Sequence, residues 1–265
     1  MQTKPLLQAL ARNRARLFTV SEAREVASSI DLQPRPSELT QALHRLCREG
    51  WIVRVKSGLY ALEPELWGGP PLHEFELAMK LAQPAAISHF SAMQHHSLTD
   101  QLPRITFVTV PQTSNPPRLE ERPRPWPMNF RFLQVQPEHF FGFVQEWVGE
   151  TSVTFTDRER TLLDGLSRPR ECGGFEEVLH GFEEALEKVE MARLFDYALR
   201  LDRVVARRLG WVLEHLGWPA DPLLLWKNRT TSECSYQPLD PTAPRQGPCI
   251  PRWGIQENLP GRLQR

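Results

Sequence analysis

The alternation of hydrophobic and polar positions is clearest between residues 37 and 48, which read SELTQALHRLCR. The apolar positions follow the i, i+3, i+4, i+7 and i+8 spacing of one helical face: Leu39, Ala42, Leu43, Leu46 and Cys47. The remaining positions carry mainly hydrogen-bonding or basic side chains. The pattern predicts an amphipathic helix with a polar, basic outer face, and Gly50 supplies its stop.

A short hairpin is predicted directly after this helix. Two apolar runs, at residues 51–55 and 59–62, each have the length and composition of a strand. Three residues separate the runs and form the predicted tip: Lys56, Ser57 and Gly58. The tip of the hairpin is therefore small and basic.

The segment before the helix predicts two further helices with a short strand between them. Helical spacing covers residues 3–12 and 23–30. Thr19 and Glu22 are spaced as a capping box, which starts the second of these helices. The order of helix, strand, helix, turn, helix and hairpin predicts a winged helix-turn-helix domain over residues 1–63.

A larger α+β domain is predicted beyond a linker. Residues 64–71 contain three prolines and two glycines, which predicts the linker, and residues 72–217 form the larger domain. The spacing predicts strands at 105–110, 129–135 and 143–155, and helices at 72–81, 87–98, 160–166, 175–188, 191–201 and 203–216. This order favours a mostly antiparallel sheet followed by a helical half. Thr156 and Glu159 again have capping-box spacing.

Regularity fades after Trp218, where eight prolines occur between residues 219 and 260. A proline lacks the backbone N–H that helices and central strands use. We expect residues 218–265 to form a proline-rich C-terminal arm that covers a sheet edge or reaches a partner.

The net charge of zero conceals two regions of opposite sign. Residues 1–62 hold ten Lys and Arg and five Asp and Glu, a net charge of +5. The remainder holds 22 basic and 27 acidic residues, a net charge of −5. A basic head on an acidic body indicates an anionic partner for the head alone.

The cysteine pattern predicts reduced thiols in a cytoplasmic protein. The four cysteines are far apart and form no CxxC pair: Cys47, Cys172, Cys234 and Cys249. They follow no secretory signal, and no run approaches the roughly 20 apolar residues that span a bilayer. We expect no membrane role.

The outer face of the helix at residues 37–48 has the side chains of a DNA-reading helix. Arg and Gln make paired hydrogen bonds to guanine and adenine edges, and basic residues of a wing contact phosphates. A helix face that only meets water usually carries Glu and Lys instead, and this alternative stays open. The candidate DNA contacts are Ser37, Thr40, Gln41, His44, Arg45 and Arg48 on the helix, with Arg54, Lys56 and Ser57 on the wing.

The usual signatures of catalysis are absent from the sequence. It contains no GxxxxGK[ST], GxSxG or HExxH motif, so we expect no enzyme, no catalytic residues and no cofactor. His89, His95 and His96 are close in sequence, but 95 and 96 face different sides of a helix and no carboxylate lies at ligand spacing. We therefore expect no metal site.

A group of carboxylates invites an enzymatic interpretation as well. Asp157, Glu159 and Asp164 could serve metal-assisted phosphoryl chemistry, but their place at the start of a predicted helix favours capping and dipole roles. Cys172, followed by two glycines, favours a tight turn before a helix over a phosphate cradle, because no strand leads into it.

Three blocks of the sequence together resemble a known family. They are GLYAL at 58–62, ISHFSAMQHHSLTDQLPRITFVTVP at 87–111 and TDRERTLLDGLSRPRECGGFEEVL at 156–179. Their order and spacing, over residues 1–216, resemble the AbiEi family of bacterial type IV antitoxins and related regulators of viral defence. None of the blocks is a catalytic fingerprint.

The resemblance implies a protein with two roles. The head would be a sequence-specific repressor that binds inverted repeats in its own promoter, with self-association on DNA, and so autoregulates a toxin–antitoxin (abortive infection) operon. The body would neutralise a nucleotidyltransferase-like toxin without a stable complex. Carried over by their positions in the sequence, the nine candidate residues named above would be the DNA contacts. No motif identifies the surface that would neutralise the toxin.

Two alternatives remain open from the sequence. In the first, the body senses a small ligand or a partner protein and tunes transcription with no toxin involved. In the second, the body is a nuclease or nucleotide-transferring domain guided by the head, which would make Asp157 and Asp164 essential.

Overall fold

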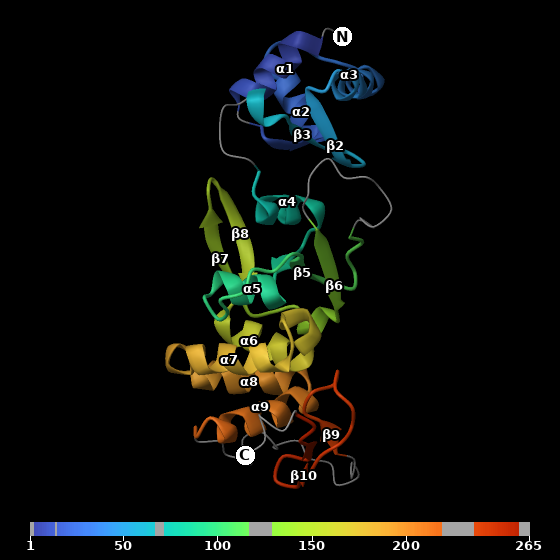
Figure 1. The fold of residues 1–265 in the computed structure, drawn as a ribbon. Coiled ribbons are helices and arrows are strands. Elements are labelled where there is room, and N and C mark those ends of the chain that lie inside the picture. The colour runs from blue at the N-terminus through green and yellow to red at the C-terminus, as the bar shows by residue number, and fades with distance from the viewer. Residues whose placement is uncertain (1–2, 14, 67–71, 117–128, 219–235, 260–265) are drawn as a thin grey trace. The chain divides into compact units, whose positions relative to one another are not determined.

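The computed structural model describes residues 3–13, 15–66, 72–116, 129–218 and 236–259 (Figure 1). Contacts within the chain divide it into two units. Unit 1 comprises residues 1–83 and 115–128, and unit 2 comprises residues 84–114 and 129–265. Each unit is described by itself below.

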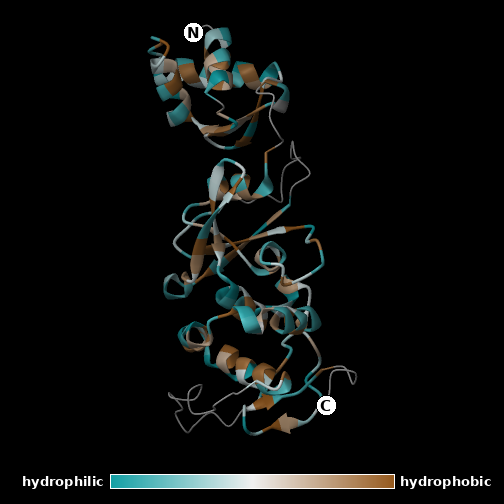
Figure 2. Cartoon of the chain, turned by 90° about the vertical axis from the view of Figure 1, so that its left-hand side faces the viewer, coloured by the Kyte–Doolittle hydropathy of each residue, from teal (hydrophilic) through white to brown (hydrophobic). Residues whose placement is uncertain are grey.

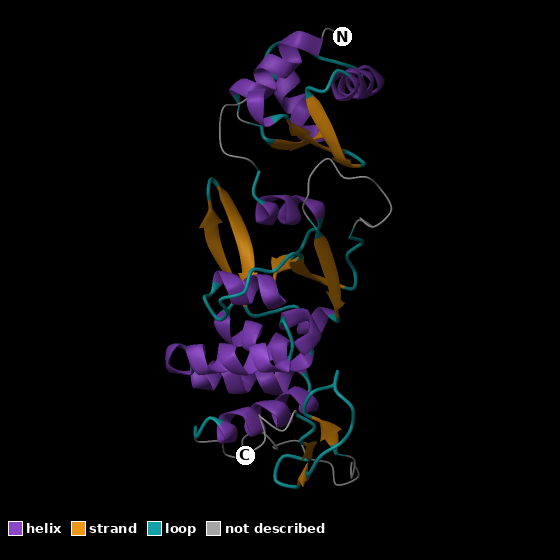
Figure 3. Cartoon of the chain, viewed as in Figure 1, coloured by secondary structure: helices purple, strands orange, loops and turns teal. Residues whose placement is uncertain are grey.

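Unit 1 begins with the predicted winged helix-turn-helix. In chain order its elements are α1 (Thr3–Arg12), β1 (Leu17–Thr19), α2 (Val20–Ser28), α3 (Pro36–Arg48), β2 (Ile52–Lys56), β3 (Leu59–Leu62) and the 3₁₀ turn η1 (Pro64–Leu66). The strands form an antiparallel sheet in the order β1-β3-β2. Figure 3 shows the three helices gathered over this small sheet. The predicted order of elements is confirmed.

Local capping explains where α2 and α3 begin. The Glu22 amide donates to Thr19 Oγ1 at 3.2 Å, and the Thr19 amide donates back to Glu22 Oε2 at 2.6 Å. This is the predicted capping box. At α3, Pro36 occupies the first turn, where no intrahelical N–H is needed, and Glu38 accepts a 2.9 Å bond from the Arg35 amide.

The core of the head joins the apolar stripes of its helices to one face of its sheet. Figure 2 shows hydrophobic and hydrophilic residues mixed along these helices, as expected of amphipathic elements. Full burial of each large aliphatic side chain contributes roughly 1.5–3 kcal/mol. The core residues that are at most 2% exposed include Leu6, Leu10, Phe18, Leu39, Leu43, Leu46, Ile52 and Tyr60.

Helix α4 (Glu74–Leu81) lies in the predicted larger domain, but its polar contacts attach it to the head. Arg16 Nη2 donates to both carboxylate oxygens of Glu76, at 2.9 and 3.1 Å, and both side chains are largely buried. Lys80 pairs with Glu22 of α2 at 2.9 Å. These ion pairs hold α4 in unit 1.

A five-stranded mixed sheet lies at the centre of unit 2. Its order is β6-β5-β4-β8-β7, formed by β4 (Ala86–Ile87), β5 (Thr106–Pro111), β6 (Phe130–Val135), β7 (Phe143–Val148) and β8 (Thr151–Thr156). The pairs β4–β5 and β7–β8 are antiparallel, whereas β5–β6 and β4–β8 are parallel. Over all the described sheets antiparallel pairs are more numerous than parallel ones, which confirms the predicted α+β class. The central sheet of unit 2 itself has two pairs of each kind.

The helices of unit 2 gather beside one end of this sheet (Figure 1). They are α5 (His89–His95), α6 (Arg158–Ser167), α7 (Phe175–Ala185), α8 (Met191–Leu201) and α9 (Arg203–His215), with the 3₁₀ turns η2 (Pro137–His139), η3 (Pro169–Cys172) and η4 (Leu186–Lys188). Residues 159–166 of α6 are all buried, so α6 is the central helix of this unit. Gly173, at φ +83°, makes the predicted turn before α7.

The predicted capping box at Thr156 and Glu159 is wrong. The N-cap of α6 is Asp157, whose side chain accepts a 2.8 Å hydrogen bond from the Arg160 amide. The Thr156 hydroxyl is instead engaged inside the protein, at 2.8 Å from the hydroxyl of Thr161. Because the Thr156 hydroxyl contacts Thr161, the adjacent Asp157 caps the helix instead. The helix therefore begins one residue later than predicted.

The described part of the predicted arm, residues 236–259, packs against α9. It forms a small sheet in the order β10-β11-β9, made of β9 (Gln237–Pro238), β10 (Cys249–Ile250) and β11 (Ile255–Gln256). Trp253 is fully buried and lies on Gly210 of α9, where any Cβ would meet the indole at 2.1 Å. Residues 219–235 and 260–265 of the predicted arm lie outside the described residues.

A buried arginine connects the same segment to the middle of unit 2. Arg208 of α9 donates to the carbonyl oxygen of Leu166 at 2.7 Å and to that of Pro238 at 3.1 and 3.2 Å. Burial lowers the pKa of Arg208 to about 10, so the guanidinium stays charged at neutral pH. The C-terminal segment is therefore part of the core of unit 2.

We predict that Trp253→Ala lowers the free energy of unfolding by about 3–5 kcal/mol, because it removes a large buried side chain and leaves a cavity against α9. Urea denaturation followed by circular dichroism measures this change. Trp147→Ala is the matched control, since Trp147 is 75% exposed and its loss should change stability by less than about 0.5 kcal/mol. Equal effects of the two substitutions would contradict the assignment of Trp253 to the core.

Candidate nucleic-acid interface

Helix α3 presents the predicted DNA-reading residues together on one exposed face. Burial of Leu39, Leu43 and Leu46 orients the helix, so the intervening polar positions point to solvent. A 13-residue helix is about 20 Å long and fits the major groove of B-DNA. The residues that the structure places on this exposed face are Ser37, Thr40, Gln41, His44, Arg45 and Arg48.

The chemistry of the face varies along α3. Arg45 and Arg48 lie in the last turn, where their positive charges also complement the negative end of the helix dipole. The Thr40 hydroxyl donates to the carbonyl oxygen of Pro36 at 3.0 Å, so towards a ligand it offers acceptor lone pairs and a methyl group. The face therefore combines cationic donors with neutral polar groups.

The predicted contact residues of the wing differ in their exposure to solvent. Arg54 and Ser57 are exposed, as a phosphate contact requires. Lys56 is half-buried, its Nζ donates to the carbonyl oxygen of Leu81 at 2.7 Å, and burial lowers its pKa. Lys56 thus connects the wing to α4 within unit 1.

An irregularity in the hairpin explains the different surroundings of Arg54 and Lys56. The pairing of β2 with β3 shifts register between these two residues. Such a bulge changes the direction of the following side chain, so residues two apart no longer share a face. No signal in the sequence marks this bulge.

The carboxylates considered for phosphoryl chemistry each have a structural partner. Asp157 caps α6 and accepts a 3.1 Å bond from the Tyr197 hydroxyl. Glu159 accepts from the backbone amide of Glu190 at 2.8 Å, and Asp164 pairs with the buried Arg160 at 2.8 Å. Their contacts are those of helix capping and core packing.

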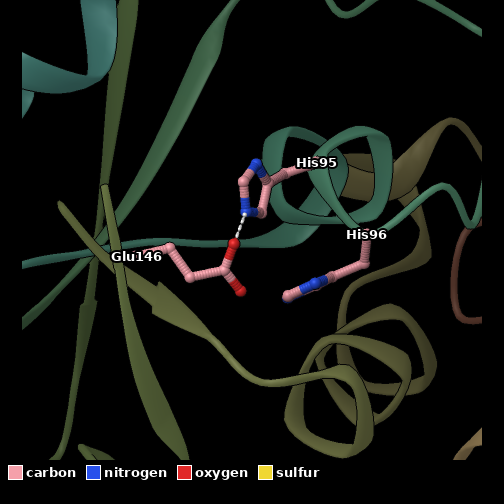
Figure 4. Close-up of side chains that lie close together, drawn as sticks. All are labelled: His95, His96 and Glu146. Carbon is pink, nitrogen blue, oxygen red and sulfur yellow. Dashed lines mark hydrogen bonds and ion pairs between the residues drawn. The ribbon is translucent and has the colours of Figure 1, made fainter. Parts of the chain in front are cut away.

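Two histidines meet a carboxylate that sequence spacing did not connect to them. Although a regular helix would separate His95 from His96, α5 ends at His95 and the two ring centroids lie 5.2 Å apart. Glu146 reaches them from β7, 51 residues along the chain, and its Oε2 lies 2.8 Å from His95 Nε2 (Figure 4). The third predicted candidate, His89, lies buried beside Ser88 with its pKa lowered to about 4 by burial.

Among the described residues, no helix is both long enough and apolar enough to span a membrane. The longest helices in the described ranges have 13 residues, whereas a bilayer core requires roughly 20.

Comparison with known proteins supports a regulatory identity for the head and a known fold for the chain. Residues 5–62 match the family model for the transcriptional regulator AbiEi antitoxin. The crystal structure of the RV2827C protein from Mycobacterium tuberculosis is similar, with a TM-score of 0.67 at 16% identity, over 95% of this chain and 89% of that chain. No curated protein sequence matches significantly.

The family match covers the part of the chain that forms the winged helix, from α1 to the end of β3. The similarity to the mycobacterial structure shows a shared fold only, because the identity is low. The resemblance found in the sequence is therefore confirmed for the head: residues 5–62 match the model of the AbiEi antitoxin family of transcriptional regulators.

Proposed function

We propose that this chain is a transcriptional repressor that binds inverted repeats in its own promoter and thereby controls a toxin–antitoxin operon in the bacterial cytoplasm. The observation that carries the proposal is the exposed face of α3, which lies in a domain of a regulator family. The six polar side chains of that face are the base-reading candidates. Arg54 and Ser57 on the wing are the phosphate contacts.

The charge distribution supports this assignment of roles. Residues 1–62 carry a net charge of +5 and the remainder carries −5. A polyanion such as DNA therefore attracts the head and repels the rest of the chain. One α3 helix reads only a half-site, and an inverted repeat has two. We therefore propose that two copies bind each operator, either as a dimer or cooperatively.

The second half of the proposal is that unit 2 neutralises a nucleotidyltransferase-like toxin encoded beside this chain. Its support is the regulator-and-antitoxin family of the head. The contacts of Asp157, Glu159 and Asp164 within the fold favour this reading over an enzymatic body. The proposal includes no stable complex between antitoxin and toxin.

We predict that replacing Arg45 and Arg48 together by alanine weakens binding to the chain's own promoter by about 1–3 kcal/mol for each lost base contact and reduces preference over scrambled DNA. Fluorescence anisotropy with both DNAs, at several salt concentrations, measures affinity and preference. Both arginines are exposed, so folding should be unaffected.

The matched control removes the same charge from another helix. Lys4 and Arg12 are exposed on α1, and replacing both by alanine should weaken binding to the two DNAs equally, leaving preference unchanged. Two results would refute DNA recognition through α3. One is promoter binding whose affinity does not change with salt concentration. The other is an Arg45, Arg48 double variant that prefers the promoter over scrambled DNA as strongly as the parent does.

The wing allows a sharper comparison between two neighbouring cations. We predict that Arg54→Met reduces the slope of log affinity against log salt by about 0.9, the value for one phosphate contact. Lys56→Met should leave that slope unchanged, because its ammonium group is hydrogen-bonded to Leu81. The opposite ranking would show that Lys56 leaves Leu81 and contacts the DNA backbone.

We also predict that expressing the adjacent gene alone arrests growth and that co-expression of this chain restores it. The Arg45, Arg48 double variant should restore growth equally while losing repression of a promoter reporter. This result would separate the antitoxic role from DNA binding. A harmless neighbouring product would refute the antitoxin half and leave the repressor half standing.

A further inference from the structure

A cluster of metal-ligand side chains lies in unit 2, whereas helix α3 belongs to unit 1. His95 and His96 at the end of α5 and Glu146 on β7 form a group in which one potential ligand atom of each lies within 4.8 Å of the others. The three side chains surround one space in Figure 4. Within the described residues, this is the one cluster of three or more such groups.

We propose that His95, His96 and Glu146 bind a divalent transition-metal ion, with zinc as the metal of choice. Two imidazoles and one carboxylate suit zinc, whereas magnesium and calcium prefer oxygen ligands alone. Three protein ligands leave the fourth tetrahedral position to water or to a ligand group of another molecule.

His96 is held in the tautomer that a metal requires. Its Nε2 lies 2.7 Å from the carbonyl oxygen of Thr156, and because a carbonyl only accepts, Nε2 carries the hydrogen. The neutral ring then presents the lone pair of Nδ1. A hydrogen bond from the other ring nitrogen to a backbone carbonyl is the usual support of a metal-bound histidine.

His95 and Glu146 already point at each other. His95 stacks on Phe155 with ring centroids 3.7 Å apart, which orients the imidazole, and its Nε2 lies 2.8 Å from Glu146 Oε2. Ligand atoms of one tetrahedral zinc ion lie about 3.3 Å apart, given bonds of about 2.0–2.1 Å. The ion would take the place of the hydrogen between nitrogen and carboxylate after small side-chain movements.

The cluster is accessible to a dissolved ion. The His95 side chain is 22% exposed and that of Glu146 is 43% exposed. Glu146 lies on β7, the edge strand of the five-stranded sheet, whereas the histidines end α5. A bound ion would therefore connect the β7–β8 hairpin to α5 and stabilise unit 2.

The test uses the full-length chain, reduced and freed of metal by a chelator. Zn²⁺ is titrated against a competing indicator dye, Co²⁺ is titrated with its visible absorption as a probe of tetrahedral geometry, and the melting temperature is recorded with and without Zn²⁺. We expect one ion per chain, a tetrahedral Co²⁺ spectrum and a higher melting temperature with Zn²⁺.

Isosteric variants identify the ligands. Glu146→Gln and His96→Gln should each weaken Zn²⁺ binding by about tenfold or more and abolish the rise in melting temperature. The glutamine at position 96 can still donate to Thr156, so the fold is preserved. His180→Asn is the matched control, since His180 and Glu183 pair at 3.9 Å on α7 but belong to no three-ligand cluster of the described residues.

Two results would overturn the proposal. One is the absence of saturable binding of either ion at one equivalent by the parent chain. The other is an affinity that Glu146→Gln leaves unchanged, which would place any bound ion elsewhere. If circular dichroism shows that His96→Gln is unfolded, Glu146→Gln and His95→Asn decide the outcome, because the side chains of Glu146 and His95 are 43% and 22% exposed.

Discussion

The orientation of the exposed polar face of α3 depends on burial of the apolar stripe of the same helix. Leu39 and Leu43 are fully buried against α1, α2 and the small sheet, and each contributes roughly 1.5–3 kcal/mol. Rotation of the helix by one residue, about 100°, would expose them and turn Gln41 and Arg45 inwards. Buried residues therefore determine which side chains of α3 face solvent, and a core substitution here would change the exposed face without altering any of its side chains.

Most helices of this protein could be predicted because their signals are local. Periodicity alone located α3, and α8 has the predicted limits, Met191–Leu201. The small errors in the predicted helix boundaries arise from tertiary contacts, which sequence periodicity does not report. Thr156 and Asp157 are adjacent and equally suited to cap α6, and the choice between them depends on the contact of Thr156 with Thr161 in the folded core.

The contacts that sequence did not reveal join residues far apart in the chain. Arg16 and Glu76 are 60 residues apart, and His95 and Glu146 are 51 apart. Such pairs have no spacing rule, because the intervening chain can follow any path that returns to the same place. The exposed polar positions of α3 could be predicted, because one helix carries them all. The role of Lys56 was not, because its partner belongs to α4.

The position of Trp253 has a consequence for the order in which the chain matures on the ribosome. The core residues that the structure describes in the head all precede residue 67, so the head can fold once that short stretch has emerged. The core of unit 2 includes Trp253 and Leu259, so it stays incomplete until residue 259 has been synthesised. A chain whose synthesis stops before Trp253 would thus carry a folded head on an unfinished body, which uncouples the two halves of the protein.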